Sequence, residues 1–414
     1  MNNIWTQVGN TIVGESFDYL GVSVVLSSDG SILAIGAAGV YGSEQVNNFG
    51  YVKIFQNINN IWTQIGDNII SEDDNTYFGS SIDLSSNGNI IAIGDPYYSS
   101  SITNIGKVKV YQNVNGVWTQ IGDNIYGTNQ EDKFGRRVSL SSDGIVLAIG
   151  AYNPYNSNID FSYTKVYNNL NGVWTQIGDT INFGPWIDLS SNGNTIAIGG
   201  TGNSAGYKKV RVYNNLNGNF TQIGLDFNSE HIWDQFGDSV SLSSDGSILA
   251  IGSPWFGSNN SSYGKVSIYK NQSQNWIKKT EIIGTQYNHY CGSSVSLSLS
   301  GNTLGVGLPG SLGLFKQTSS GEVKVFDLSS LFSLNTNTFV LENFTIIPNP
   351  TSQLININLN NSLEFQKATI YNTLGQIIKN ETTKYISVSD LSKGTYFIEV
   401  ETNKGKATKS FIKE

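Results

Sequence analysis

Cysteine and histidine are nearly absent from this chain of 414 residues, which has one cysteine and two histidines. The single Cys291 excludes an internal disulfide framework and a zinc ribbon, because both need several thiols. The two histidines, His231 and His289, offer little material for a zinc site or a catalytic triad. We therefore expect no metal, no cofactor and no catalytic residue, and we expect packing to stabilise the fold.

Basic clusters and long apolar runs are also missing. The formal net charge is −8 and only 14% of the residues are charged, so the clustered basic surface that nucleic acid requires is absent. No run of eighteen apolar residues occurs, and none is expected to span a membrane. The first residues carry no basic and apolar leader, so the sequence as given predicts no signal peptide.

What the chain does have is a repeated segment of seventeen residues. It reads FGDSVSLSSDGSILAIG at Phe236–Gly252 and returns five times at intervals of roughly 50 to 58 residues. The other copies begin at Leu20, Phe78, Phe134, Phe183 and, in a weaker form, Cys291. A motif at a fixed period of this length predicts a repeat architecture.

Each copy has the pattern of a β-hairpin. Apolar and serine residues alternate on both sides of an Asp-Gly or Asn-Gly pair, as in a strand with one buried face. Asp-Gly and Asn-Gly favour two-residue hairpin turns. Because Asp and Asn alternate freely at this position, we expect turn geometry rather than charge to be required there, and we expect these turns to bind no metal.

Two further strands complete each unit. One resembles GKVKVY at 106–111, and the other resembles WTQIG at 118–122, with an Asn-Gly turn between them. Four antiparallel strands at this period are typical of a β-propeller blade. The chain begins with a fourth strand, Trp5–Gly9, and leaves the repeat after a third strand, Val323–Phe326. We predict that these two segments pair and close a ring of six blades, which removes two open sheet edges.

The strand order places the short turns on one face of the ring and the long, variable connections on the other. Variable loops on a rigid scaffold are common binding sites. Aromatic rings beside polar groups on such a face are suited to bind sugars. The candidate ligand-binding residues on the long-loop face are Tyr97, Tyr98, Tyr152, Tyr155, Trp233, Trp255, Phe256, Asp73, Asp74, Asp132 and Asp234.

Two catalytic readings compete with binding. A carboxylate pair on the long-loop face could hydrolyse a glycoside if held at the right separation, but the same residues would also form a solvated acidic rim. His289 and Cys291 could form a nucleophile with its base, but Cys291 aligns with Phe78 and Phe134, which indicates an apolar packing position.

The connection that enters the fourth repeat is about seven residues shorter than its counterpart in the third, and this predicts a notch in the rim.

The repeats resemble the FG-GAP blades of integrin α-subunit heads, through Phe78-Gly79 and Gly94-Asp95-Pro96. The resemblance implies a propeller. Calcium-binding members of that family have several carboxylates before the turn glycine, whereas the turns here supply one or none. We therefore carry no calcium site over to this chain.

The last seventy residues have a different pattern, with short strands separated by Asn, Gly and Lys turns, which predicts a small β-sandwich. They resemble the type IX secretion sorting domain of Bacteroidetes, through Pro348, Asn349, Pro350, Gly375, Gly394, Tyr396 and a basic terminal strand. The resemblance implies export through the type IX machinery and removal of the domain, which leaves the protein secreted or attached to the outer-membrane surface. Such cargo begins with a signal peptide, so we expect a mis-set start or a processed form.

Together these observations predict an all-β chain with three parts. Residues 1–329 form a six-bladed β-propeller closed by its N-terminal strand, residues 330–343 form a linker, and residues 344–414 form an Ig-like β-sandwich with the sorting function. We expect a non-catalytic protein that binds an extracellular glycan or surface protein through its long-loop face. The alternatives are a secreted glycoside-active enzyme and a structural spacer.

Overall fold

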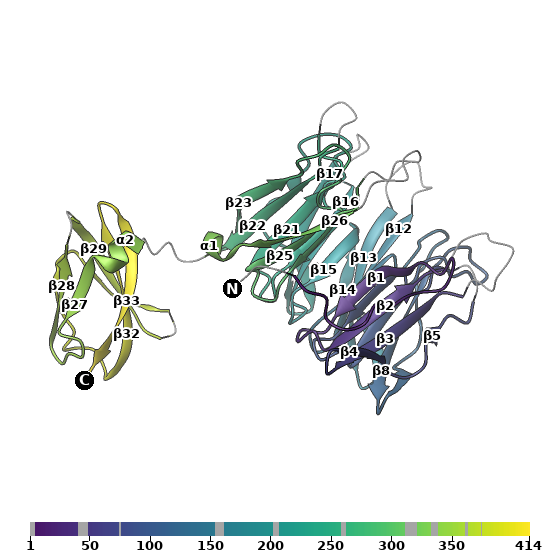
Figure 1. The fold of residues 1–414 in the computed structure, drawn as a ribbon, viewed down its shortest axis with the longest axis horizontal. Coiled ribbons are helices and arrows are strands. Elements are labelled where there is room, and N and C mark those ends of the chain that lie inside the picture. Colours follow the sequence, from purple (N-terminus) through teal and green to yellow (C-terminus); the bar gives the residue numbers. More distant parts are fainter. Residues whose placement is uncertain are drawn as a thin grey trace. The chain divides into compact units, whose positions relative to one another are not determined.

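The computed structural model describes residues 5–39, 49–73, 76–153, 161–201, 207–257, 262–310, 321–332, 338–360, 363–373 and 375–414. The protein is built almost entirely of β-strands (Figure 1). It divides into two compact units, Met1–Leu328 and Ser329–Glu414. The predicted all-β class is confirmed, and each unit is described below by itself.

The first unit contains six consecutive antiparallel sheets, one for each sequence repeat. The first strand of each sheet comes from the segment that follows the Phe-Gly pair or its equivalent: β1 (Leu20–Leu26), β6 (Ser81–Leu84), β11 (Arg137–Leu140), β15 (Pro185–Leu189), β20 (Ser239–Leu242) and β24 (Ser294–Leu297). The second strands carry the Ala-Ile-Gly pattern or its equivalent: β2 (Ile32–Ala37), β7 (Ile90–Asp95), β12 (Val146–Asn153), β16 (Thr195–Thr201), β21 (Ile248–Ser253) and β25 (Thr303–Leu308).

The outer strands follow in the predicted order. The third strands are β3 (Tyr51–Ile58), β8 (Lys107–Val114), β13 (Phe161–Leu170), β17 (Lys208–Leu216), β22 (Lys265–Gln272) and β26 (Glu322–Asp327). The fourth strands are β4 (Ile61–Gln64), β9 (Val117–Gln120), β14 (Val173–Ile181), β18 (Asn219–Gln222) and β23 (Asn275–Ile283). Three short strands continue the fourth-strand pairing farther along the third strand: β5 (Ile69–Ile70), β10 (Ile125–Tyr126) and β19 (Phe227–Asn228).

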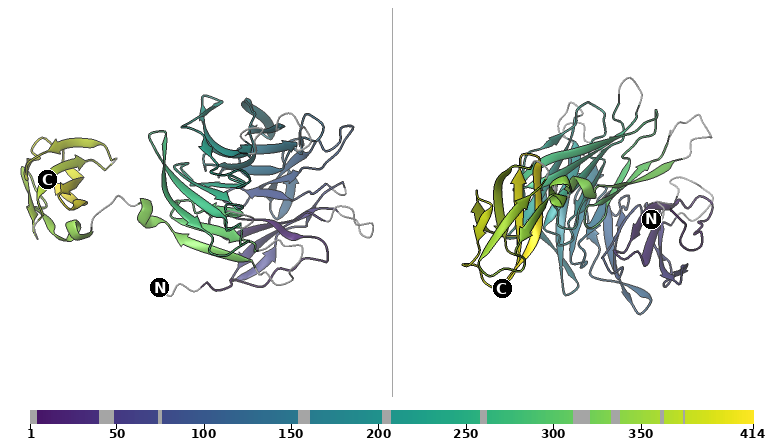
Figure 2. Two further views of the ribbon diagram at one scale, coloured as in Figure 1. Left: turned by 90° about the horizontal axis from the view of Figure 1, so that it is seen from above. Right: turned by 60° about the vertical axis from the view of Figure 1, so that its left-hand side comes forward.

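The six sheets follow one another in chain order around a shared cavity (Figure 2). Apolar cores lie between successive sheets. Between the first and second sheets, for example, Val52 and Ile54 pack with Phe78, Ile82 and Leu84. The close approach of the sheets explains the repeated glycines, since a Cβ atom on Gly94 would lie 2.1 Å from the carbonyl oxygen of Gly135 in the next sheet.

The two kinds of predicted turn differ in the structure. Asn115-Gly116 between β8 and β9 is a two-residue turn in which both residues have positive φ, as expected for the favoured hairpin type. The prediction is wrong for the Asp-Gly turns, because five residues separate β1 from β2 and only Gly30 has positive φ there. The carboxylate of Asp29 accepts hydrogen bonds from Ser27 Oγ and Ser31 N, and the amide oxygen of Asn87 accepts the same pair from Ser85 and Asn89. The turn needs only a side-chain oxygen that accepts hydrogen bonds at this position, which explains why Asp and Asn alternate there.

The predicted pairing of Trp5–Gly9 with Val323–Phe326 is not formed. Among the described residues, β26 pairs with β25 alone. The N-terminal segment lies beside the first sheet instead, where Val8 O accepts a hydrogen bond from Trp62 Nε1 at 3.0 Å. This contact repeats those of Trp118 with Ile65 and Trp174 with Ile121, both at 3.1 Å. The segment therefore has the inter-sheet contact of a fourth strand without the strand pairing.

The second unit has two antiparallel sheets around one apolar core, as predicted for a sandwich. One sheet contains β27 (Phe344–Ile347), β28 (Leu354–Leu359) and β31 (Tyr385–Ser387), and the other contains β30 (Ile377–Glu381), β29 (Phe365–Tyr371), β32 (Gly394–Thr402) and β33 (Gly405–Lys413). The segment predicted as a linker contains two short helices, α1 (Ser329–Phe332) and α2 (Thr338–Glu342). Val340 of α2 is fully buried in the sandwich core, so that core begins before residue 344.

We predict that Trp118→Ala lowers the free energy of unfolding of the first unit by about 3 kcal/mol, because the indole packs against the core between the first two sheets. Trp118→Phe should cost less, since it keeps a ring and loses chiefly the hydrogen bond to Ile65. Chemical denaturation measures both. Trp255→Ala is the control, because that indole is 53% exposed. Equal losses at Trp118 and Trp255 would contradict the packing role.

Candidate functional site

The long-loop face is built from the connections that enter each Phe-Gly segment and those that join second to third strands. Several predicted acidic residues on it are turned inward. Asp132 is 2% exposed, and its carboxylate accepts hydrogen bonds from Asn129 N at 2.7 Å and Tyr163 Oη at 2.6 Å. Asp234 is 3% exposed and accepts one from His231 N at 3.0 Å. These carboxylates hold the loops in shape.

Asp73 belongs to a second type of contact, an ion pair that joins the connection before β6 to the second sheet. Lys107 Nζ lies 2.7 Å from the Asp73 carboxylate and 3.5 Å from that of the fully buried Asp95. The same ammonium lies 3.7 Å from the centre of the Tyr98 ring. Burial raises the pKa of Asp95 to about 6, and the nearby Lys107 partly offsets this effect. Tyr98 is therefore engaged by a lysine of its own sheet.

Two other predicted aromatic residues are held in a similar way. The Phe256 ring lies 3.9 Å from Lys265 Nζ, and Lys265 pairs with Glu230 at 2.7 Å. Tyr97 lies with its ring centre 4.9 Å from that of Tyr77. Cation–π and ring–ring contacts of this kind stabilise loops.

Among the predicted aromatic residues that the structure describes, the two tryptophans are the exposed ones. Trp233 is 70% exposed and Trp255 is 53% exposed. Trp255 N donates a hydrogen bond to Asp234 O at 3.1 Å, which joins the two loops that carry them. Of the remaining predicted residues, Asp74 and Tyr155 lie outside the described residues.

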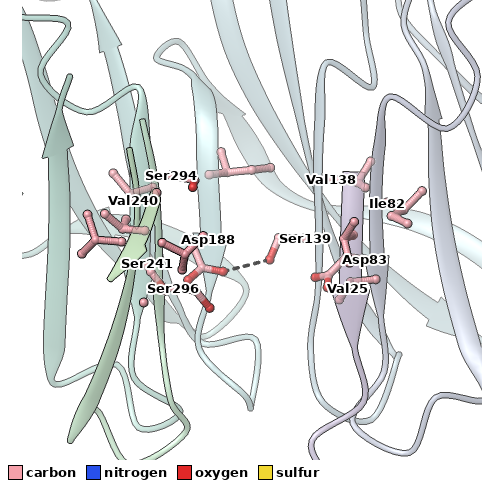
Figure 3. Close-up of a pocket in the computed structure, with 17 residues that line it drawn as sticks. Val25, Ile82, Asp83, Val138, Ser139, Asp188, Val240, Ser241, Ser294 and Ser296 are labelled. Atoms are coloured by element: carbon pink, nitrogen blue, oxygen red, sulfur yellow. Dashed lines mark hydrogen bonds between the residues drawn. The ribbon is translucent and has the colours of Figure 1, made fainter. Parts of the chain in front are cut away.

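The first strands of all six sheets line the shared cavity, which encloses about 500 Å³ (Figure 3). One residue from each strand occupies the same repeat position there: Val25, Asp83, Ser139, Asp188, Ser241 and Ser296. A first strand is the inner edge of its sheet, so its outward N–H groups need partners from elsewhere.

Side chains at this position supply those partners from the neighbouring sheet. Asp83 accepts from Leu140 N at 2.6 Å and Asp188 accepts from Leu242 N at 2.7 Å. The serines do the same, with Ser139 accepting from Leu189 N and Ser241 from Leu297 N, both at 3.1 Å. Val25 cannot accept a hydrogen bond, and Leu84 N donates instead to Oδ1 of the adjacent Asp83 at 2.9 Å.

The two carboxylates share Ser139, which lies between them and donates to Asp188 at 3.5 Å (Figure 3). Burial raises the pKa of Asp83 to about 6 and that of Asp188 to about 7, and the charge of Asp83 contributes to the second shift. Groups that titrate near neutral pH in a cavity can act as general acids or bases.

A smaller cavity of about 190 Å³ lies at the long-loop end of the shared cavity. Its lining includes Arg137, Trp186, Asp238, Ser239, Ser293 and Ser294. We call this site the channel mouth. It lies at the long-loop end because first strands begin there, and Arg137 and Ser239 are the first residues of β11 and β20.

A lysine ammonium and a tyrosine ring lie near the tryptophan of the channel mouth. Lys208 Nζ lies 4.3 Å from the centre of the Trp186 ring and forms an ion pair with Asp238. The Tyr152 ring, one of the predicted aromatic residues, lies 6.0 Å from Trp186. The short connection on which the predicted notch rests lies beside it, since three residues join β14 to β15 where ten join β10 to β11.

Sequence reasoning missed Arg137, Trp186, Asp238 and Lys208, and also the pair Asp83 and Asp188. The available signal was departure from the repeat. Arg136-Arg137 and Pro185-Trp186 stand where the second and sixth repeats have Ser-Ser. A residue that differs from its repeat equivalents, at a position facing the shared cavity, indicates a functional site more strongly than an aromatic residue in a variable loop does.

The motif residues of the second unit fix its last strand. Asn349 Nδ2 donates to Ser410 O at 3.1 Å, and Asn349 Oδ1 accepts from Ile412 N at 2.9 Å. Pro350 and Pro348 flank this contact in the chain. Tyr396 stacks on Phe411 with ring centres 5.7 Å apart, and Gly375 and Gly394 have positive φ.

Residues 345–414 match the secretion system C-terminal sorting domain. This protein therefore carries a sorting domain. The domain implies interaction with the type IX secretion machinery, and it marks the protein for export to the cell surface or the medium with the domain removed. No described helix is long and apolar enough to cross a membrane.

The remaining comparisons add little. No curated protein matches the sequence. The solved structure of TolB from Acinetobacter baumannii aligns with a TM-score of 0.37 and 14% identity, over 64% of this chain and 54% of TolB. The match thus spans about half the length of TolB, and these comparisons do not show FG-GAP repeats.

We predict that Asp188→Asn stabilises the first unit relative to the wild type, and that this gain is larger at pH 8 than at pH 4. The folded protein keeps the Asp188 proton up to about pH 7, whereas the unfolded chain releases it near pH 4. The wild-type free energy of unfolding therefore falls as pH rises between these values. Asparagine cannot ionise and still offers an acceptor to Leu242 N.

The difference between variant and wild type should grow by on the order of 2 kcal/mol between pH 4 and pH 8, as measured by urea denaturation. Asp29→Asn is the control, because hydrogen bonds from Ser27 and Ser31 lower the pKa of Asp29 to about 2, and it should show no such gain. A constant difference at both pH values would contradict the burial of an ionisable Asp188.

Proposed function

We propose that this is a non-catalytic binding protein of the cell exterior, whose first unit recognises an extracellular glycan. The observation that carries the proposal is the placement of aromatic side chains at the long-loop end of the first unit. Trp233 and Trp255 are exposed, and Trp186 lines the channel mouth beside polar groups. Flat aromatic faces next to hydrogen-bonding side chains suit the apolar faces and hydroxyl groups of sugars.

The acidic residues of the loops favour binding over hydrolysis. Asp132 and Asp234 are buried and serve as acceptors for loop backbone, so they are unsuited to act on a bound sugar. The alternative function, a glycoside hydrolase, is favoured by one observation: Asp83 and Asp188 project into the shared cavity with raised pKa values. Both carboxylates accept backbone N–H groups of the next sheet, which gives them a structural role.

We predict that the purified full chain binds a subset of immobilised glycans and hydrolyses none of them. Trp255→Ala and Trp186→Ala should each weaken binding about ten-fold, because stacking on an aromatic ring is lost. A glycan array followed by titration calorimetry measures this. Tyr385→Ala is the control, since that exposed ring belongs to the second unit.

Three other results would replace the proposal. Flat binding across the array would favour a protein ligand on the same face, or a spacer role. Release of sugars that is abolished by Asp188→Asn would identify a hydrolase. Equal effects of all three aromatic substitutions would show that the binding is not specific to the first unit.

We further propose that the six sheets form a closed six-bladed propeller. Five links join successive turns, in which Ser28, Ser86, Ser142, Ser191 and Ser244 each donate N–H to the equivalent carbonyl of the next sheet. The sixth link would run from Leu299 N to Ser28 O. Closure of the ring would form it.

The two faces at the seam between the sixth and first sheets carry residues that are buried at other interfaces. Val323 and Val325 are 78% and 40% exposed, whereas their equivalents Val52 and Ile54 are buried. On the opposite side, Val24 and Leu26 are exposed, whereas the equivalents Ile82 and Leu84 are buried. Contact between the two faces would remove this apolar surface from water.

A glycine supports the same conclusion. Gly307 is the repeat equivalent of Gly94, yet no backbone of another sheet lies near its added Cβ. Inside its own sheet, the nearest atom to an added Cβ is the rotatable Oγ of Ser294, at 2.2 Å. Closure would bring up a backbone that cannot give way, as Gly135 approaches Gly94. The Trp5–Gly9 segment, already seated beside Trp62, would then lie next to the open edge of β26.

We predict that Ser28→Cys with Leu299→Cys forms a disulfide under mild oxidation, because closure brings these two backbone positions into hydrogen-bonding contact. The matched control is Ser86→Cys with Ser142→Cys, whose backbones are already linked at 2.8 Å. Non-reducing mass spectrometry of peptides reports both. A cross-link in the control pair alone would show that the ring stays open.

A further inference from the structure

The channel mouth differs from the rest of the first unit in its charge. The chain has a net charge of −8, yet Asp238 is the one carboxylate in the lining of the channel mouth, and the charges of Lys208, Arg137 and Arg136 all act on it. Lys208 pairs with that carboxylate. The two arginines are therefore left as an excess of positive charge among the described residues of the site.

Arg137 is placed to receive a ligand. Its side chain lines the cavity of about 190 Å³, and the described structure gives its guanidinium one hydrogen bond, from Nη1 to Arg136 O at 3.1 Å. Burial lowers the pKa of Arg137 to about 10, so the group stays charged at neutral pH. A guanidinium has five N–H donors in a planar fork that matches a carboxylate.

The neighbouring wall of the same cavity is aromatic. Trp186 stands on β15, the strand that follows β11 around the cavity, and Tyr152 and Lys208 hold its ring. The short connection before β15 leaves this wall without the long loop that other sheets have. The cavity volume is below the roughly 300–1,000 Å³ of typical small-molecule pockets, which favours a single sugar ring over a longer segment.

We propose that the channel mouth binds a carboxylate-bearing sugar, such as a uronic acid residue of an acidic polysaccharide. The sugar carboxylate pairs with the guanidinium of Arg137, with Arg136 adding charge at the rim, and the sugar ring lies against Trp186. Serine hydroxyls of Ser293 and Ser294 line the remaining wall. This inference rests on the proposed glycan-binding function and specifies its ligand class.

The test compares ligands that differ only in the carboxylate. Polygalacturonate and its carboxyl-reduced polymer are titrated into the full chain by calorimetry, at low and at physiological salt. We expect binding of polygalacturonate and at least ten-fold weaker binding of the reduced polymer. Arg137→Gln should weaken binding of the acidic polymer at least ten-fold, as expected for loss of a charge-assisted pair. Its affinity for the neutral polymer should be unchanged.

Lys393→Gln is the matched control, because it removes the same charge from an exposed position in the second unit and should leave affinity unchanged. If Arg137→Gln does not fold, as judged by circular dichroism, Arg136→Gln at the rim provides the second variant, with an expected loss of about three-fold. Equal affinity for the two polymers, or equal effects of Arg137→Gln and Lys393→Gln, would overturn the carboxylate assignment while leaving glycan binding intact. Absence of binding to any glycan, neutral or acidic, would overturn the proposed function itself.

Discussion

The first unit depends on how the inner edges of its sheets are satisfied. Each first strand faces the shared cavity with backbone N–H groups that no strand of its own sheet can accept. Side chains of the preceding sheet accept them, namely those of Asp83, Ser139, Asp188 and Ser241. One turn residue in each sheet, beginning with Ser28 and ending with Leu299, links the same neighbours through backbone hydrogen bonds. Hydrogen bonds between sheets, added to the apolar cores, fix the rotation of each sheet relative to the next.

This constraint also explains why the cavity contains carboxylates that titrate near neutral pH. An aspartate at the edge-capping position gains a backbone donor from the next sheet but loses water, and for Asp83 and Asp188 the loss of water is the larger effect. Serine meets the same structural need without charge. The two aspartates therefore cost stability at neutral pH relative to a neutral acceptor, and such a cost is often retained where a cavity has a function.

The long-loop end and the sorting domain fit one functional scheme. Loops held by internal carboxylates and lysines present aromatic residues rigidly, and rigid presentation reduces the entropy that a ligand must overcome. The second unit, recognised through residues 345–414, sends the protein out of the cell, where polysaccharides are accessible. In the proposed function, the arginines near the channel mouth distinguish the chemistry of the ligand within an otherwise acidic protein.

The sequence alone determined the repeat, the four-strand unit, the placement of long loops on one face and the sorting domain, because strand periodicity, Gly-containing turns and the motif around Asn349 are local signals. It also predicted the short connection before Pro185, since loop length can be counted. It could not place Asp132 or Asp234, whose carboxylates look like a solvated rim until the loop folds around them. Only the tertiary structure brought Arg137, Trp186 and Asp238 together, because these residues come from three sheets whose first strands meet at one axis. The pairing of Trp5–Gly9 with β26 is equally a long-range contact, which the local pattern predicted and the structure does not form; the contact of this segment with Trp62 came from the structure alone.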